Sequence, residues 1–221
     1  MLEFTTVPTP RRGFLGTMAA AAAAVGLGGS LPSRLAAESP SARSSNPDLE
    51  AWFGKIKGKH RQVFDSPRPA EGLPGVWPRV YLMTMADTYP GESITAVLII
   101  RHDAIPLALN DAMWSKYKLG EAFNIKAGET PATTNIYATI KGLPLPDIGV
   151  AELVKTGVLV GACNMALKVA GLTIAKQTGG DADAIHKELL SNLLPGIQPV
   201  PSGVMAVGRA QELGCKYCFA A

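Results

Sequence analysis

The chain has 221 residues, of which 21 are basic and 18 acidic, and it contains only three cysteines. A net charge of +3 gives no electrostatic footprint for a nucleic acid partner, and three cysteines are too few for a disulfide scaffold. The length suits a single domain with a sizeable core.

The first 37 residues have the layout of a bacterial export signal. Arg11 and Arg12 precede Gly-Phe-Leu, an apolar run extends from Met18 to Leu27, and small residues lead to a cleavage site after Ala37. The run is shorter than a membrane span, which needs about 20 apolar residues. This pattern predicts a twin-arginine signal and export to the periplasm through the twin-arginine machinery. The alternative is a chance Arg-Arg pair before a buried Ala-rich helix.

Residues 38–76 are predicted to form a flexible linker and an N-terminal arm. The segment from Glu38 to Pro47 is rich in Ser and Pro, and Asp48 to Lys59 is a candidate short helix with Trp52 and Phe53 as anchors. Because the signal holds three arginines and one glutamate, 18 basic and 17 acidic residues remain after cleavage. We therefore expect a near-neutral mature protein that does not span a membrane.

From residue 77 to residue 221, strands and helices alternate. This alternation predicts an α/β domain with a mainly parallel sheet flanked by helices on both faces, in three layers. The predicted strands cover 80–85, 95–100, 157–162, 197–200 and 215–219, and the predicted helices cover 105–117, 148–155, 163–171, 181–193 and 202–213.

Three polar segments follow the predicted strands, where the ligand sites of parallel sheets lie. They are Arg101-His102-Asp103, Cys163-Asn164 and Pro201-Ser202-Gly203. Cys163 ends a buried strand and opens a helix, where free amide donors and the helix dipole favour a thiolate. This position suits a reactive or persulfide-carrying cysteine, while a small packing residue is the alternative.

Two stretches resemble the DsrE/DsrF-like sulfur-relay family. One is Gly157-Val158-Leu159-Val160-Gly161-Ala162-Cys163-Asn164, and the other runs from Leu194-Pro195-Gly196 through Pro201-Ser202-Gly203 to Gly214. The resemblance implies a small α/β domain that assembles as trimers or hexamers. It also implies that sulfane sulfur passes through Cys163, with Asn164, Ser202 and Gly203 beside it.

Cys215 and Cys218 have the CxxC spacing of a redox pair. A redox CxxC normally opens a helix, whereas this pair lies in a predicted strand, where side chains three residues apart point to opposite faces. A disulfide or redox role therefore stands beside the simpler interpretation as strand residues. The sequence offers no set of metal ligands around them, and we expect neither a metal nor a cofactor.

His102 and Asp103 form a second candidate binding pair. A histidine can act as a base, and a carboxylate can orient it. Because adjacent residues rarely face each other, we expect His102 to use a distant partner or to be a solvated strand end bonded to backbone.

The leading hypothesis is an exported DsrE-like protein that binds or relays sulfane sulfur or another thiol-reactive species through Cys163. The alternative is a non-catalytic oligomeric module of a periplasmic redox system. A sulfur carrier or redox protein is the expected partner. We also expect a homo-oligomer, in which the apolar helix from Ile105 to Trp114 and the arm from Asp48 to Leu73 contact a neighbour.

Overall fold

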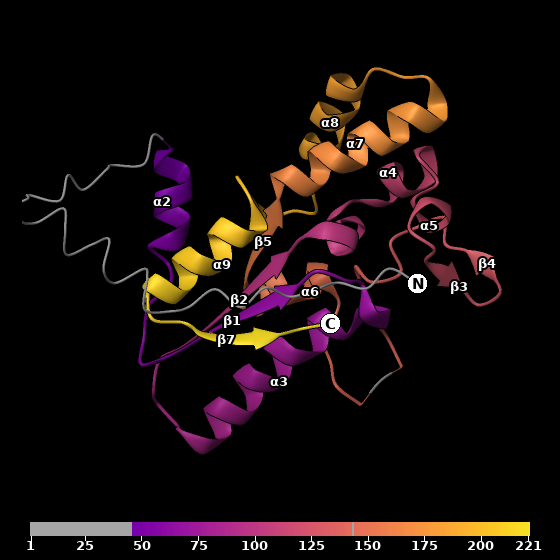
Figure 1. Ribbon diagram of the computed structural model, residues 1–221. Coiled ribbons are helices and arrows are strands. Elements are labelled where there is room, and N and C mark those ends of the chain that lie inside the picture. The colour runs from indigo at the N-terminus through magenta and orange to yellow at the C-terminus, as the bar shows by residue number, and fades with distance from the viewer. Residues whose placement is uncertain (1–45, 143) are drawn as a thin grey trace, which may run out of the picture. The chain divides into compact units, whose positions relative to one another are not determined.

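The computed structural model describes residues 46–142 and 144–221. Its centre is a five-stranded sheet in the order β6-β5-β2-β1-β7, and all four ladders are parallel (Figure 1). The strands are β1 (His60–Ser66), β2 (Ile94–Ile100), β5 (Leu159–Cys163), β6 (Gln198–Val200) and β7 (Lys216–Phe219). All their carboxyl ends therefore meet at one edge of the sheet.

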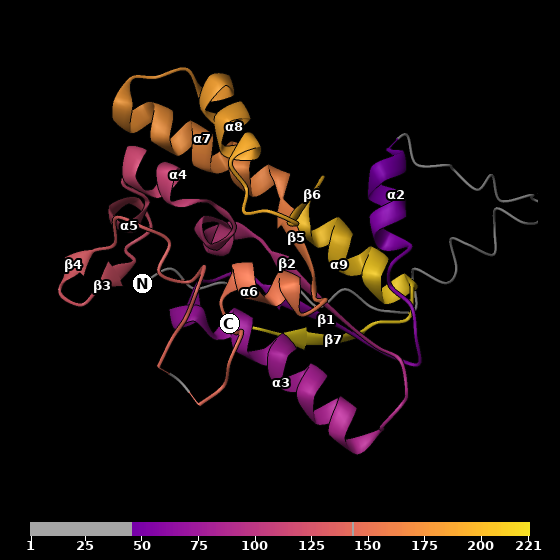
Figure 2. The same ribbon diagram turned by 180° about the vertical axis from the view of Figure 1, so that it is seen from behind.

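Helices cover both faces of this sheet, as Figures 1 and 2 show. One face carries α2 (Pro47–Phe53) and α9 (Gly203–Glu212), and the other carries α3 (Leu73–Thr88), α6 (Val150–Lys155) and the 3-10 helix η2 (His102–Ala108). Helices α7 (Asn164–Thr178) and α8 (Ala182–Ser191) pack side by side. The remaining elements are η1 (Ala70–Gly72), α4 (Asp111–Lys116), α5 (Leu119–Ala122) and the hairpin of β3 (Lys126–Ala127) and β4 (Thr130–Pro131). The predicted three-layer α/β class is confirmed.

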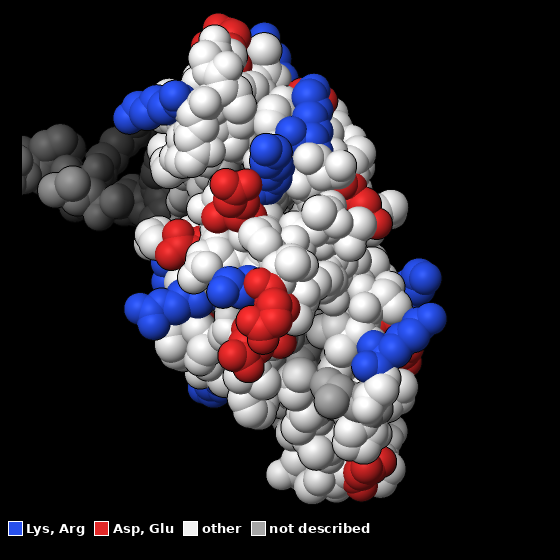
Figure 3. All heavy atoms as spheres, turned by 90° about the vertical axis from the view of Figure 1, so that its right-hand side faces the viewer, with Lys and Arg blue, Asp and Glu red and all other residues white. Residues whose placement is uncertain are grey.

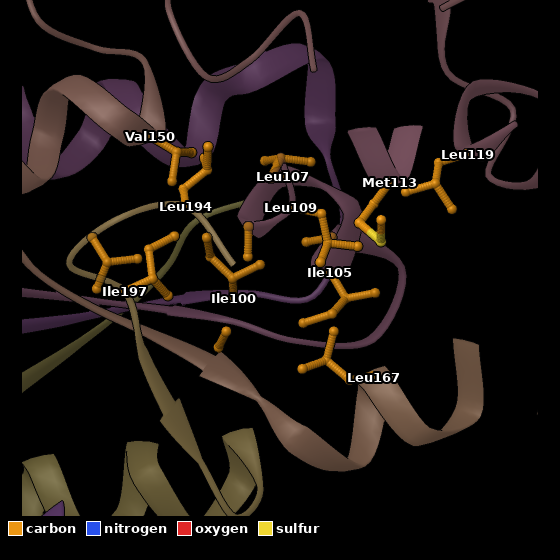
Figure 4. Packing of buried hydrophobic residues seen from close by; sticks show 14 of the residues in the cluster. Ile100, Ile105, Leu107, Leu109, Met113, Leu119, Val150, Leu167, Leu194 and Ile197 are labelled. Carbon is orange, nitrogen blue, oxygen red and sulfur yellow. The ribbon is translucent and has the colours of Figure 1, made fainter. Parts of the chain in front are cut away.

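The central strand β2 divides two hydrophobic clusters. Val97 and Ile99 face the cluster under α2 and α9, whereas Leu98 and Ile100 face the larger cluster on the opposite side. Each of these four side chains is fully buried. A strand buried on both faces reads as a continuous β-branched run, which is why this segment was predictable. Figure 4 shows the packing of the larger cluster around Ile100, Leu107 and Leu109.

The segment predicted as a strand over residues 80–85 instead lies inside helix α3. Pro74 lies in its first turn, where the missing N–H costs no helical hydrogen bond. Gly75 and Pro78 are buried, and Leu82 packs on the larger cluster, so burial follows helical spacing. A short apolar run does not by itself distinguish a buried strand from a helix, and here the strand prediction was wrong.

The strand of the central sheet that was not predicted from the sequence is β1, which lies between β2 and β7. Its Val63 and Phe64 are buried on opposite faces of the sheet, and the preceding Trp52 and Phe53 are also buried within this chain. The burial of these aromatic side chains therefore does not require a neighbouring subunit. Helix α2 and strand β1 therefore contribute to the same hydrophobic clusters as the rest of the sheet.

The predicted helix over residues 105–117 is broken into η2 and α4. Pro106 lies inside η2, and Asn110 caps α4 through its side-chain oxygen, which accepts a hydrogen bond from the Met113 amide. Ile105 and Trp114 are 1% and 0% exposed. This segment is core, so it does not supply the exposed apolar patch that was expected for assembly.

Candidate functional site

A pocket of about 970 Å³ lies at the carboxyl edge of the sheet. It collects the ends of β2 and β5, the start of α9 and the loop after β1, together with α5 and one side of α7. Its lining comprises Arg68, Pro69, Ala70, Arg101, His102, Asp103, Ile105, Ala122, Phe123, Asn124, Cys163, Met165, Ala166, Val169, Ala170, Thr173, Ser202, Gly203, Val204 and Ala221. Five of the predicted site residues, Cys163, His102, Asp103, Ser202 and Gly203, therefore meet at one place.

Cys163 is the last residue of β5 and the N-cap of α7. Its backbone is extended, with φ −69° and ψ 110°, and its Sγ accepts a hydrogen bond from the Ala166 amide at 3.3 Å. The residue is 6% exposed but lines the pocket. The sulfur thus takes the place that a Ser or Asp oxygen usually has at a helix start, where amide donors and the helix dipole favour negative charge.

Arg101 approaches the same place from the end of β2, held by Asp65 at the end of β1. Its Nε and Nη2 donate to the two carboxylate oxygens of Asp65 at 2.6 and 2.9 Å. This pairing raises the pKa of Arg101, and charge on Cys163 contributes in the same direction. Such a two-pronged pair fixes the guanidinium plane more firmly than a single contact. Asp65 was not predicted as a site residue because β1 was not predicted as a strand; an acidic residue directly after Val63-Phe64 was the available signal.

Tyr217 on β7 adds a third member to this cluster. Its hydroxyl donates to Asp65 at 3.0 Å. Burial, followed by the hydrogen bond to Asp65, raises the pKa of Tyr217. Asp65 therefore connects the pocket to the edge strand of the sheet.

Gly203 and Ser202 shape the start of α9. A Cβ on Gly203 would lie 2.7 Å from Cβ and 2.8 Å from Cδ of Arg101, so only glycine leaves room for this arginine. The Ser202 hydroxyl accepts from the Met205 amide at 3.2 Å and caps the helix. These two residues therefore build the site rather than supply a free reactive group.

His102 and Asp103 do face each other, contrary to the expectation for adjacent residues. Nδ1 of His102 lies 3.1 Å from Oδ1 of Asp103, and both side chains are exposed at the mouth of the pocket. His102 has φ 51°, in the left-handed region, and this turn at the start of η2 brings the two side chains together. The His102 side chain is thus paired with its neighbour in the sequence, and not with a distant residue or with the backbone among the residues that the structure describes.

Asn164 is the predicted binding residue that does not line the pocket. Its Oδ1 lies 2.7 Å from Nε2 of His186 on α8. Burial is the main cause that lowers the pKa of His186, so the neutral ring carries its proton on Nε2 when the amide oxygen accepts. Asn164 thus ties α8 to the first turn of α7.

Cys215 and Cys218 are both free thiols and lie on different sides of the sheet. Cys215 belongs to the cluster under α2 and α9, whereas Cys218 packs against the larger cluster. Burial raises the pKa of Cys215 to about 11, although Arg61 opposes this shift. The structure does not bring the two sulfurs together, in keeping with their three-residue spacing in a strand.

The rest of the described surface offers no other obvious centre of chemistry. Within residues 46–142 and 144–221, no group of three or more His, Cys, Asp and Glu side chains is placed to hold a metal. No helix in these ranges is long and apolar enough to cross a membrane. On the face drawn in Figure 3, basic and acidic side chains are interspersed and form no continuous basic surface.

The chain is similar in structure to MTH1491 from Methanobacterium thermoautotrophicum, a protein of unknown function. The TM-score is 0.40 at 20% identity, and the match covers 73% of this chain and 99% of that chain. No family model and no curated protein matches the chain. So distant a likeness carries no functional conclusion, and the fold class rests on the strand order itself.

Proposed function

We propose that this protein binds or relays sulfane sulfur, or another thiol-reactive species, through Cys163. The observation that carries the proposal is the position of its sulfur, which accepts an amide hydrogen bond at a helix start and borders an open pocket. A helix N-terminus is one of the environments that favour the reactive thiolate form of a cysteine. The resemblance to DsrE/DsrF-like proteins supports the same residue.

The proposed transfer needs no external oxidant or reductant. The Cys163 thiolate attacks the outer sulfur of a persulfide R–S–SH, the S–S bond breaks, and R–S⁻ leaves as Cys163 becomes a persulfide. An acceptor thiol then attacks the outer sulfur of that persulfide and regenerates the Cys163 thiol. The Ala166 amide, which donates to Sγ of Cys163 at 3.3 Å, favours negative charge on the sulfur during both steps.

Intact-mass measurement after exposure to polysulfide tests this proposal. We expect a sulfur adduct that maps to Cys163, is removed by a small thiol and is absent from Cys163→Ser. Cys218→Ser is the matched control, because Cys218 is also partly accessible but lies outside the pocket. An adduct that persists in Cys163→Ser, or no adduct in the native protein, would overturn the proposed role.

The second candidate is a non-catalytic oligomeric module of a periplasmic redox system. Its support is the edge strand β7, where Tyr217 and Phe219 are 48% and 54% exposed beside unpaired backbone groups. Exposed apolar side chains on a sheet edge are a common contact surface. We therefore propose a homo-oligomer, a trimer or hexamer by family resemblance, whose mass by light scattering falls when Tyr217 and Phe219 are both replaced by Ser.

Export is the remaining part of the proposal. Arg11 and Arg12 lie outside the described residues, so the sequence pattern alone supports a twin-arginine signal. Replacing both with Lys keeps the charge but removes the pair that the export receptor recognises. Unprocessed precursor should then stay in the cytoplasm, whereas normal processing of the double variant would remove the assignment.

A further inference from the structure

The pocket beside Cys163 is much larger than inorganic sulfur requires. A water molecule occupies about 30 Å³ of liquid, and a polysulfide of a few atoms needs only a few times that volume. The pocket measures about 970 Å³, which is within the range of roughly 300–1,000 Å³ found for small organic ligands. Its size therefore indicates a ligand with an organic body.

The walls of the pocket are apolar. Met165 and Val169 lie one turn apart on α7, and Val204 lies in the first turn of α9; they are 51%, 57% and 72% exposed. Ile105 and Phe123 complete the lining from other elements. Apolar side chains that stay open to water around a concave surface are typical of a ligand site, because covering them lowers the free energy.

The two arginines that line the pocket differ in their partners. Arg101 is paired with Asp65. Arg68 is exposed and has no ion-pair or hydrogen-bond partner for its side chain among the described residues. Arg68 is therefore the arginine that is left to contact an anionic group of the ligand.

We propose that the pocket takes an amphipathic organic persulfide or disulfide, with its apolar body along α7, an acid group at Arg68 and its sulfur at Cys163. This inference rests on the proposed reactivity of Cys163 and names its substrate class. With a disulfide R–S–S–R′, the Cys163 thiolate forms a bond to the sulfur of R, the S–S bond breaks, and R′–S⁻ leaves with the electron pair.

Mixed 2-pyridyl disulfides with methyl, butyl and octyl bodies are suitable probes, because release of thiopyridone reports the rate at which Cys163 is labelled. Each fully buried methylene strengthens binding roughly fourfold. In this open pocket we expect octyl to label Cys163 at least about tenfold faster than methyl at low probe concentration, with saturation. A terminal carboxylate on the octyl probe should add a further gain that Arg68→Gln removes.

Val169→Ser and Leu172→Ser form a matched pair on α7. The two native residues are 57% and 53% exposed, but only Val169 lines the pocket. Val169→Ser should lose most of the octyl preference, whereas Leu172→Ser should keep it. Equal rates for methyl and octyl, or equal effects of the two variants, would overturn the inference and leave Cys163 reactive.

A covalent bond is not needed to test the apolar body. Calorimetric titration of octanoate into Cys163→Ser should show binding that Val169→Ser weakens in the same background. If Cys163 fails to react with every probe while octanoate still binds, the relay function fails and the apolar ligand site stands. If octanoate does not bind and the probes show no chain-length preference, the inference fails by itself.

Discussion

The end of β5 and the strand β7 both carry cysteines, but they give them different surroundings. Cys163 begins a 15-residue helix and borders a pocket, while Cys215 and Cys218 follow a helix and lie in or beside a strand. At Cys163 an amide N–H reaches the sulfur at 3.3 Å; at Cys215 burial raises the pKa to about 11. The CxxC spacing therefore says less about reactivity than the end of the helix at which a cysteine lies.

Asp65 links these two regions. Its carboxylate binds Arg101 of the pocket and accepts from Tyr217, which lies between the two cysteines of β7. Its backbone carbonyl also accepts from the Ala220 amide. Changes at Asp65, Tyr217 and the cysteines therefore show whether the pocket and the edge strand act separately or together.

The largest effect is expected for alkylation of the folded protein. Near pH 8, only about one Cys215 thiol in a thousand is ionised, because its pKa is about 11. Cys163→Ser should therefore remove most of the fast iodoacetamide labelling, while Cys215→Ser should leave it unchanged. Peptide mass mapping measures both, and labelling after unfolding is the control. Fast labelling of Cys215 in the native protein would break the distinction between the two regions.

Asp65→Asn should cause the largest loss of stability. Removing one partner of a buried pair leaves the other charge uncompensated, and Arg101 is only partly exposed. We expect the free energy of unfolding to fall by about 3 kcal/mol in denaturant titrations. Tyr217→Phe removes a single hydrogen bond and should cost about 1 kcal/mol.

Equal losses in these two variants would contradict the view that Arg101 is the main partner of Asp65. A drop in Cys163 labelling with Asp65→Asn, but not with Tyr217→Phe, would show that Asp65 affects Cys163 through the pocket and not through strand β7.

Some elements of the fold were predictable from the sequence, and others were not. Strand β2 and the β5–α7 junction were predictable, because a fully buried β-branched run and an apolar strand that ends in Cys carry their own signals. Strand β1 was not, because its first residues, His60, Arg61 and Gln62, are polar and only half-buried. Its partners on both sides, β2 and β7, supply the pairing that its own composition does not indicate.

The sequence predicted that several residues would lie near one another at this edge of the sheet, but it did not predict their contacts. Parallel strands place their carboxyl ends at one edge, so Cys163, His102 and Gly203 were expected near one another. Asp65 was missed together with β1. The direct contact of His102 with Asp103 depends on a left-handed backbone at His102, which the sequence does not indicate.

Gly203→Ala and Gly208→Ala compare two glycines of the same helix. A Cβ at Gly203 meets Arg101 at 2.7 Å, whereas a Cβ at Gly208 meets no atom within 4 Å. Gly203→Ala should cost about 2 kcal/mol through overpacking, and Gly208→Ala should gain up to about 1 kcal/mol through helix propensity. Thermal unfolding of both variants measures this difference of sign. A loss in both would mean that α9 tolerates no substitution, whatever the contact with Arg101.

The smallest effect concerns pH and the buried thiol of β7. The pKa of Cys215 is raised from 9.0 to about 11 in the folded protein, so between these values the folded state holds a proton that the unfolded chain releases. Its contribution to stability is complete below pH 9 and falls as pH rises toward 11. Cys215→Ala should change the free energy of unfolding at every pH. In reducing buffer, the free energy of unfolding of this variant should also decline less steeply with pH across this window than that of the native protein. Chemical denaturation at several pH values gives both slopes, and parallel slopes would show that the Cys215 thiol is not buried enough to hold its proton.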